Sequence, residues 1–283
     1  MKSLLLLLGV LLSPMLSSDK DIQKVFDVHL HGSSDVPAQL AALEQAGVHR
    51  AAISTSWNLQ NSYRGKSKIN FLYGLMFPCP NGHVPYSLQP CFPNGQDWPS
   101  LHWVEEQIKA GKIDFLGEIL SQYYGISSSD SLLLPYYALA ERYNLPVGIH
   151  TGGAGPNHGA PNFKEELGSP LHFEKLLSTF PKLKVWIMHA GDSYYSDAIS
   201  IMTQNEQVYA DISVLSNPAI VSADRFAAIM SAFMEAGLED RLMFGTDNGD
   251  VRQVIAAING LTFLSKKQKD KIFFQNAARF FAE

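Results

Sequence analysis

Short apolar runs alternate with longer amphipathic segments along almost the whole chain. Eight runs are rich in Val, Ile, Phe or Trp and are mostly too short for helices, which is typical of buried parallel strands. Segments with helical spacing follow most of them, with Ser or Asp near their starts and Gly or Pro near their ends. The predicted strands are 25–31, 51–54, 69–76, 113–119, 146–150, 183–189, 207–212 and 241–245, and the predicted helices are 37–46, 100–110, 131–143, 170–179, 194–205, 223–236, 250–259 and 265–281.

This alternation predicts a single (β/α)8 barrel, the TIM-barrel fold of the α/β class. The chain of 283 residues fits one such domain, since these barrels typically have about 250 residues. A doubly wound open sheet would also alternate, but the chain has no Gly-rich phosphate loop of the kind such folds carry. The segment 77–98, rich in Pro, Asn and Gly, is expected to be a loop insertion after the third strand, at the active-site end of the barrel.

The first residues follow a different pattern. Lys2 precedes an apolar run over 4–12, which a Ser-containing stretch connects to polar residues. This layout predicts a signal peptide over 1–18, a barrel domain over 19–283, and an exported protein, periplasmic or secreted. The apolar run is short for a membrane-spanning helix, and an uncleaved anchor is the alternative. We expect no stable membrane association after cleavage.

Two cysteines, Cys79 and Cys91, flank a loop-like segment of the predicted insertion. Because an exported protein meets an oxidising compartment, we expect a disulfide between them. The alternative is a pair of unpaired thiols. A metal site made from these two residues is disfavoured, since they do not form a C-x-x-C pair.

The charge balance disfavours two classes of partner. The 22 basic and 27 acidic residues give a net charge of -5, with no long run of either sign. Nucleic acids and anionic membranes are bound by basic patches or runs, so neither is expected here. A small-molecule substrate is expected instead, and the oligomeric state stays open, a homo-oligomer included.

Residues that can bind metals stand at the ends of the predicted strands. His29 and His31 are two positions apart in the first strand, so both imidazoles point to one face and can share a cation. An ionisable residue beside a strongly apolar run is costly unless it is paired, hydrogen-bonded or metal-bound. The pattern therefore predicts a metal site at the carboxyl ends of the strands. Four other predicted strands end in, or are followed by, Glu118, His150, His189 and Asp247.

Several motifs resemble those of one protein family. In chain order they are DVHLH (27–31), a strand-end Glu at 118, GIH (148–150), MHAG (188–191), GTD (245–247) and NAARFF (276–281). From about residue 25 to the end of the chain, this series resembles the amidohydrolase superfamily. It is most similar to the amidohydrolase-related branch of TIM-barrel metal-dependent hydrolases and decarboxylases.

The resemblance implies a set of ligands for a divalent metal ion. Glu118 stands where many members with two ions have a carboxylated lysine, so one ion or two remain open. Zn²⁺ is the expected ion from ligand softness and availability, although these ligands do not distinguish it from manganese or iron. The implied ligands are His29, His31, Glu118, His150, His189 and Asp247, of which Asp247 and His189 are also implied to be catalytic.

The expected function is a metal-dependent hydrolase that uses metal-activated water. A bound divalent ion lowers the pKa of water from 15.7 to about 7. Asp247 then acts as general base, while His189 or the metal polarises the scissile carbonyl of a small amide, ester or lactone. A metal-dependent nonoxidative decarboxylase of the same branch is the alternative, and a non-catalytic metal-binding barrel is a third hypothesis.

Three residues in or beside loops are expected to contact substrate: His158, Arg64 and Tyr123. The competing interpretations are a solvent-exposed histidine for His158 and simple aromatic packing for Tyr123. Further acidic residues are expected to support the ligands or to cap helices, namely Asp192, Asp211 and Asp250.

Overall fold

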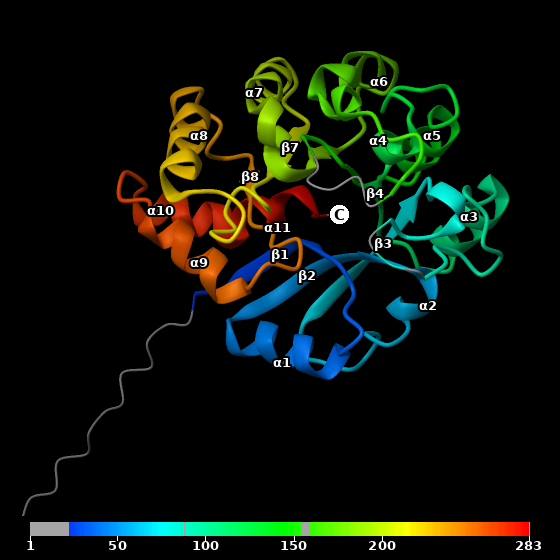
Figure 1. The fold of residues 1–283 in the computed structure, drawn as a ribbon, viewed down its shortest axis with the longest axis horizontal. Coiled ribbons are helices and arrows are strands. Elements are labelled where there is room, and N and C mark those ends of the chain that lie inside the picture. Colours follow the sequence, from blue (N-terminus) through cyan, green and yellow to red (C-terminus); the bar gives the residue numbers. More distant parts are fainter. Residues whose placement is uncertain (1–22, 86, 88, 154–158, 283) are drawn as a thin grey trace, which may run out of the picture.

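The computed structural model describes residues 23–85, 87, 89–153 and 159–282 (Figure 1). The predicted signal peptide over 1–18 and the candidate substrate residue His158 lie outside these ranges. Export and the start of the barrel domain therefore stay predictions. Among the described helices, none is long and apolar enough to cross a membrane.

Eight parallel strands form the centre of the fold, and each pairs with the next one along the chain. Backbone hydrogen bonds from Val28 N to Phe244 O (3.0 Å) and from Asp247 N to His29 O (2.8 Å) join the eighth strand region to the first. The predicted barrel is confirmed, and the open doubly wound sheet is wrong. The strands are β1 (Val25–Leu30), β2 (Val48–Thr55), β3 (Asn70–Phe77), β4 (Phe115–Ile119), β5 (Val147–Ile149), β6 (Val185–Ile187), β7 (Val208–Asp211) and β8 (Leu242–Met243).

Helices surround the barrel in a ring (Figure 1). The α-helices are α1 (Val36–Gln45), α2 (Trp57–Gln60), α3 (Leu101–Lys109), α4 (Ser121–Tyr124), α5 (Leu134–Arg142), α6 (Glu174–Thr179), α7 (Tyr195–Gln204), α8 (Ala223–Glu235), α9 (Val251–Gly260), α10 (Lys266–Asp270) and α11 (Asn276–Phe280). Short 3-10 segments are Pro80–Gly82, Glu165–Gly168, Pro170–Phe173 and Met188–Tyr194. The short helices α2 and α4 were not predicted. The predicted helix over 265–281 is divided into α10, a π-helical turn (Lys271–Gln275) and α11.

Ser and Asp side chains fix where several helices begin. The Ser100 hydroxyl accepts a hydrogen bond from Trp103 N at 3.3 Å, where α3 starts. The Asp250 carboxylate accepts hydrogen bonds from Arg252 N (2.9 Å) and Gln253 N (3.1 Å), where α9 starts. Each contact satisfies an amide that has no partner within its helix. Asp250 is thus a helix cap, as the sequence predicted.

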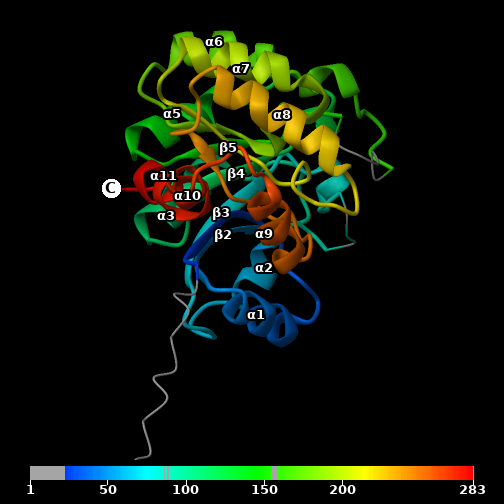
Figure 2. The same ribbon diagram turned by 90° about the vertical axis from the view of Figure 1, so that its left-hand side faces the viewer.

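Aromatic side chains fill the end of the barrel at which the strands begin. The ring of Phe281, just after α11, lies 5.4 Å from the rings of both Phe26 and Trp186, and the ring of Phe280 lies 5.7 Å from that of Trp186. Figure 2 shows α11 at this end of the molecule. Burial of a large apolar side chain stabilises a fold by about 1.5–3 kcal/mol. This end is therefore apolar core, and the buried ionisable groups lie at the other end.

The segment after β3 is anchored to the carboxyl ends of neighbouring strands. The structure joins Cys79 and Cys91 in a disulfide, the pairing that the sequence favoured, and both residues are buried. Trp57 N, in the first residue of α2 and two residues after the end of β2, donates a hydrogen bond to Cys91 O (3.0 Å), and Cys79 N donates one to Asp97 O (2.8 Å). No regular strand or α-helix is formed by its described residues between Phe77 and Leu101. The chain here is thus an extended loop beside the barrel mouth.

We predict that Gly148→Ala in β5 destabilises the barrel by about 1–3 kcal/mol, the usual cost of overpacking a core. A Cβ atom at Gly148 would lie 2.3 Å from Cζ2 of the fully buried Trp186. Gly260→Ala is the matched control, because a Cβ atom there meets nothing within 4 Å. Urea unfolding of both variants measures the difference, and equal stability of the two would contradict this view of the core.

Candidate metal centre

Six residues from five strand ends meet at the carboxyl end of the barrel. They come from β1, β4 and the turns that follow β5, β6 and β8, which places side chains distant in sequence around one space. The four histidines and the glutamate are buried, none of them more than 6% exposed. The structure thus brings together all six ligands implied by the resemblance, namely His29, His31, Glu118, His150, His189 and Asp247.

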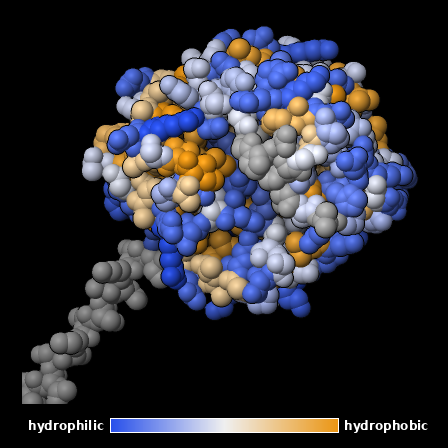
Figure 3. Space-filling view, viewed as in Figure 1, coloured by the Kyte–Doolittle hydropathy of each residue, from blue (hydrophilic) through white to orange (hydrophobic). Residues whose placement is uncertain are grey.

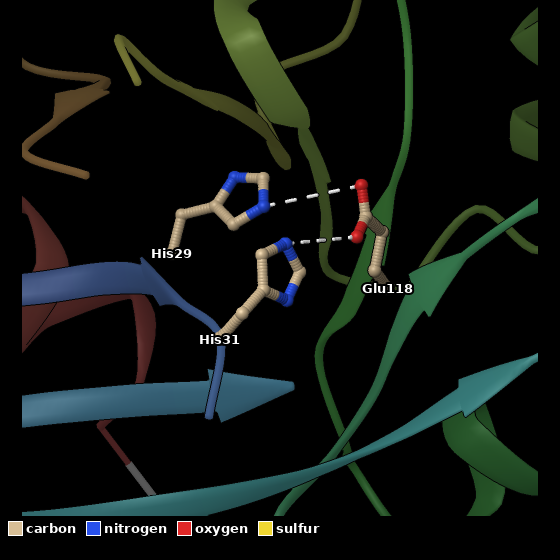
Figure 4. A group of neighbouring side chains, drawn as sticks. All are labelled: His29, His31 and Glu118. Atoms are coloured by element: carbon tan, nitrogen blue, oxygen red, sulfur yellow. Dashed lines mark ion pairs between the residues drawn. The ribbon is translucent and has the colours of Figure 1, made fainter. Parts of the chain in front are cut away.

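His29 and His31 both turn their rings toward Glu118 (Figure 4). Nε2 of His29 is 3.9 Å from Oε1 of Glu118, and Nε2 of His31 is 3.4 Å from Oε2. Asp247 approaches the same pair, with Oδ1 3.0 Å from Nε2 of His31 and 3.8 Å from Nε2 of His29. Two imidazoles and two carboxylates therefore surround the first half of the centre.

His150 and His189 face Glu118 from the other side. Nδ1 of His150 is 2.5 Å from Oε1 of Glu118, and Nε2 of His189 is 3.9 Å from the same oxygen. Nε2 of His189 is also 3.3 Å from Nδ1 of His150. Glu118 thus lies between two histidine pairs, in a position to contact one ion or to bridge two.

The residues fit a divalent cation. Nε2 of His29 and Nε2 of His150 are buried and have no hydrogen-bond partner among the described residues. A buried polar atom left without a partner costs about 1–3 kcal/mol. Among the residues that the structure describes, three sets of three histidines and carboxylates each offer three ligand atoms that lie within 4.8 Å of one another. Such nitrogen and oxygen donors suit Zn²⁺ and other first-row divalent ions.

Left-handed backbone turns aim the ligands that follow β6 and β8. His189 has φ of 61°, and Asp247 and Asn248 have φ of 47° and 58°. These are unfavourable angles for residues other than glycine, and such outliers persist where the surrounding structure holds them. Asn248 Oδ1 accepts a hydrogen bond from His31 N at 3.0 Å, which ties this turn to the end of β1.

Two further residues hold β1 against the β8 turn. The Thr246 hydroxyl donates a hydrogen bond to Oδ2 of Asp27 (2.6 Å), and Thr246 N donates to its Oδ1 (3.1 Å). Burial raises the pKa of Asp27 to about 7, although these hydrogen bonds oppose the shift. Neither residue was predicted as a support, although Asp27 extends the alternation of His29 and His31 by one step toward the start of the strand.

Opposite charges control the ionisation of the centre. Burial alone would lower the pKa of His29, His31 and His189, but the carboxylates beside them raise it overall, for His189 to about 9. His150 is the exception, because burial outweighs Glu118 and lowers its pKa. Burial would likewise raise the pKa of Glu118, yet the histidines, His150 first, hold it well below its usual range. The carboxylates are therefore charged at neutral pH.

The predicted substrate residues have different positions. Tyr123 is 4% exposed, and its ring lies 5.0 Å from the ring of His150 and 5.3 Å from that of Phe163, so it is a buried neighbour of the centre.

Figure 3 shows the face seen in Figure 1 to be hollowed near its centre, with hydrophilic residues inside.

The prediction for Arg64 is corrected by its contacts. Its Nη2 donates a hydrogen bond to Lys112 O (2.9 Å), and its guanidinium carbon lies 3.7 Å from the centre of the Tyr73 ring. Arg64 lies between α2 and β3, and Lys112 precedes β4, so both stand where the chain returns to the starts of strands. Arg64 therefore belongs to the opposite end of the barrel from the metal centre.

Comparison with known proteins decides the family. A family model described as amidohydrolase matches residues 101–282, which is more than half of the chain. The chain belongs to the amidohydrolase family. A search of curated proteins found no match to this amidohydrolase.

Solved structures support the same fold for this amidohydrolase. An uncharacterized TIM-barrel protein from Bordetella bronchiseptica is 16% identical, with a TM-score of 0.65 over 91% of this chain and 98% of that one. A probable 2-pyrone-4,6-dicarboxylic acid hydrolase from Acinetobacter baumannii is 14% identical, with a TM-score of 0.60 over 91% and 99%. A dihydroxybenzoic acid decarboxylase from Polaromonas sp. JS666, with bound manganese, is 12% identical, with a TM-score of 0.61 over 92% and 97%. At these identities the likeness shows the fold alone.

We predict that loading this amidohydrolase with Zn²⁺ releases protons at neutral pH. With a pKa raised to about 9, His189 keeps a proton at neutral pH in the metal-free protein, and the pKa values of His29 and His31 are shifted in the same direction. Only a neutral imidazole binds a metal ion. The apparent affinity should therefore rise between about pH 6 and pH 8. Isothermal titration in buffers of different ionisation enthalpy counts the released protons. A binding heat independent of the buffer, with an affinity independent of pH, would contradict the prediction.

Proposed function

We propose that this protein is a metal-dependent hydrolase that cleaves a small amide, ester or lactone. The observation that carries the proposal is the convergence of four buried histidines and two carboxylates at the carboxyl end of the barrel. Active sites of TIM-barrel enzymes form at this end. Membership of the amidohydrolase family supports the proposal as well.

His29, His31 and Asp247 would hold one divalent ion, for which we propose Zn²⁺. When bound, such an ion supplies Lewis acidity and lowers the pKa of water to about 7. Glu118, His150 and His189 surround the place for a second ion on the other side of Glu118. The choice of Zn²⁺ rests on the mixture of imidazole and carboxylate donors, since the decarboxylase from Polaromonas sp. carries manganese.

Asp247 has the properties of the group that accepts a proton from the attacking water. Its side chain is 27% exposed, whereas that of Glu118 is 3% exposed, so Asp247 reaches the space that water and substrate can enter. Burial would raise the pKa of Asp247, but the hydrogen bond with His31 and the charge of His29 hold it below its usual range. Asp247 is therefore a carboxylate at neutral pH, able to take the proton and pass it to the leaving group.

His189 has a role that depends on the number of ions. If only the His29 and His31 side is loaded, a protonated His189 would donate a hydrogen bond from Nε2 to the carbonyl oxygen of the substrate. If both sides are loaded, His189 and His150 are ligands. Tyr123, packed against His150, is proposed to form part of the wall that the substrate touches.

The setting of the reaction is also a proposal. The apolar leader over 1–18 and the Cys79–Cys91 disulfide support an exported protein, periplasmic or secreted. The substrate is then a small molecule met outside the cytoplasm. A homo-oligomer is compatible with this proposal.

We predict that Asp247→Asn lowers kcat/KM by about 100-fold or more, because general acid–base groups typically contribute about 10²–10⁴-fold. Purified protein loaded with Zn²⁺ is assayed on a panel of aryl esters, lactones and anilides, with and without a chelator. Asp224→Asn is the matched control, since this aspartate is exposed in the first turn of α8. Turnover that survives both the chelator and Asp247→Asn would overturn the proposal.

Decarboxylation is the second candidate function. Solved structures named as 2,6-dihydroxybenzoate and 5-carboxyvanillate decarboxylases share the fold at 12% identity. The same metal-loaded protein is therefore also given hydroxybenzoates, and release of CO2 is measured. Chelator-sensitive CO2 release without any hydrolysis would replace the hydrolase proposal with a decarboxylase.

A further inference from the structure

One hydroxyl group contacts two of the candidate ligands. Oγ of Ser213, two residues after the end of β7, is 3.0 Å from Nδ1 of His29 and 2.9 Å from Nδ1 of His189. Ser213 is fully buried, and so is Asp211, whose Oδ1 lies 2.5 Å from the same hydroxyl oxygen. Histidines from β1 and from the β6 turn are thus linked through residues at the end of β7.

The chemistry of these groups fixes the direction of each hydrogen bond. A carboxylate only accepts, so the hydroxyl hydrogen of Ser213 must point to Asp211. The remaining lone pairs of the hydroxyl oxygen then accept from the Nδ1–H groups of His29 and His189. In the neutral form of each ring, its single proton is therefore held on Nδ1.

Asp211 reinforces this arrangement through both carboxylate oxygens. Oδ2 is 3.1 Å from Nδ1 of His29, which gives that nitrogen a second acceptor. Oδ1 accepts hydrogen bonds from the backbone amides of His189 (3.2 Å) and Ser213 (3.0 Å). With Nδ1 of each ring engaged, the Nε2 atoms of His29 and His189 are the ones that face Glu118.

Two features of the neighbouring backbone allow Asp211 and Ser213 to contact His29. Val214, directly after Ser213, has φ of 62°, a costly angle for a β-branched residue. Gly245 leaves the space free, since a Cβ atom there would lie 2.9 Å from Cβ of His29 and 3.2 Å from both Asp211 Oδ1 and Ser213 Cβ. The left-handed turn at Val214 and the missing side chain at Gly245 therefore leave room for Asp211 and Ser213 to contact His29.

We infer that Asp211 and Ser213 are a positioning pair, which keeps the protons of His29 and His189 on Nδ1 and so presents the Nε2 atom of both to a divalent cation. The inference rests on the metal centre of the proposed function. One pair thereby sets the ligand atom on both sides of Glu118. His31 is oriented independently, because its Nδ1 lies 2.7 Å from the backbone carbonyl of Ser54.

Asp211→Asn tests most directly which nitrogen of His29 carries the proton. The carbonyl oxygen of the new side chain can keep the bonds from the amides of His189 and Ser213, and its NH2 group then faces Nδ1 of His29. A donor in that position moves the proton of His29 to Nε2, where it blocks the metal. Ser213→Ala removes the shared hydroxyl and leaves the carboxylate.

The matched control is Ser216→Ala. Ser216 lies in the same loop after β7 and is equally buried, but its hydroxyl donates to Ile212 O (2.9 Å). Thermal unfolding identifies variants that have lost the fold, and Ser213→Thr, which keeps the hydroxyl, tests for rescue.

Zn²⁺ affinity is measured by competition with a chromophoric chelator. We expect Asp211→Asn and Ser213→Ala to weaken binding by about 10–100-fold, the usual effect of removing a group that orients metal-binding histidines. Asp211→Asn should be the weaker binder, and Ser216→Ala should equal the unaltered protein. Nitrogen NMR of the zinc-loaded protein should place the protons of His29 and His189 on Nδ1.

The outcomes separate this inference from the proposed function. If the unaltered protein binds Zn²⁺ tightly and the folded Ser213→Ala and Asp211→Asn variants bind it equally well, the positioning pair is refuted while the metal centre stands. If the unaltered protein binds no Zn²⁺, the metal centre and the proposed function fail, and the inference fails with them. Selective weakening by the two variants supports the pair.

Discussion

The structure depends most on the stabilisation of one buried carboxylate. Glu118 is 3% exposed, and imidazoles from β1, β5 and β6 surround its two oxygens. A charge in such a place is costly unless opposite charge and hydrogen bonds compensate for it. Protons on the histidines can do so without a metal, and a divalent cation can do so while also satisfying the unpaired Nε2 of His29. This exchange of protons for a cation underlies both the proposed chemistry and the role of Asp211 and Ser213.

The barrel makes this arrangement possible by separating its two ends. Aromatic residues in and just after α11 fill the end where the strands begin, and the ionisable residues gather where the strands finish. The Asp27–Thr246 hydrogen bonds and the left-handed turns at His189 and Asp247 then hold the ligands at fixed angles. A buried apolar core at one end thus supports a charged site at the other.

Most of the fold could be predicted from the sequence because apolar runs directly report buried strands. His29 and His31 could be paired because alternate residues of a strand share a face. The break in the predicted helix over 265–281 could not be foreseen from spacing alone. The contact of Ser213 with two histidines was equally hidden, because it depends on where β7 stands relative to β1 and β6. Arg64 was misplaced because its loop lies before a strand, where chains return to the far end of the barrel.

The most direct measurement is a crystal structure of the zinc-loaded protein with anomalous diffraction data at the zinc edge. We expect an anomalous peak next to Nε2 of His29, Nε2 of His31 and a carboxylate oxygen of Asp247. A second peak beside His150 and His189 would show that the centre holds two ions, with Glu118 between them. No peak among these residues in zinc-saturated crystals, or zinc bound only elsewhere on the protein, would contradict it.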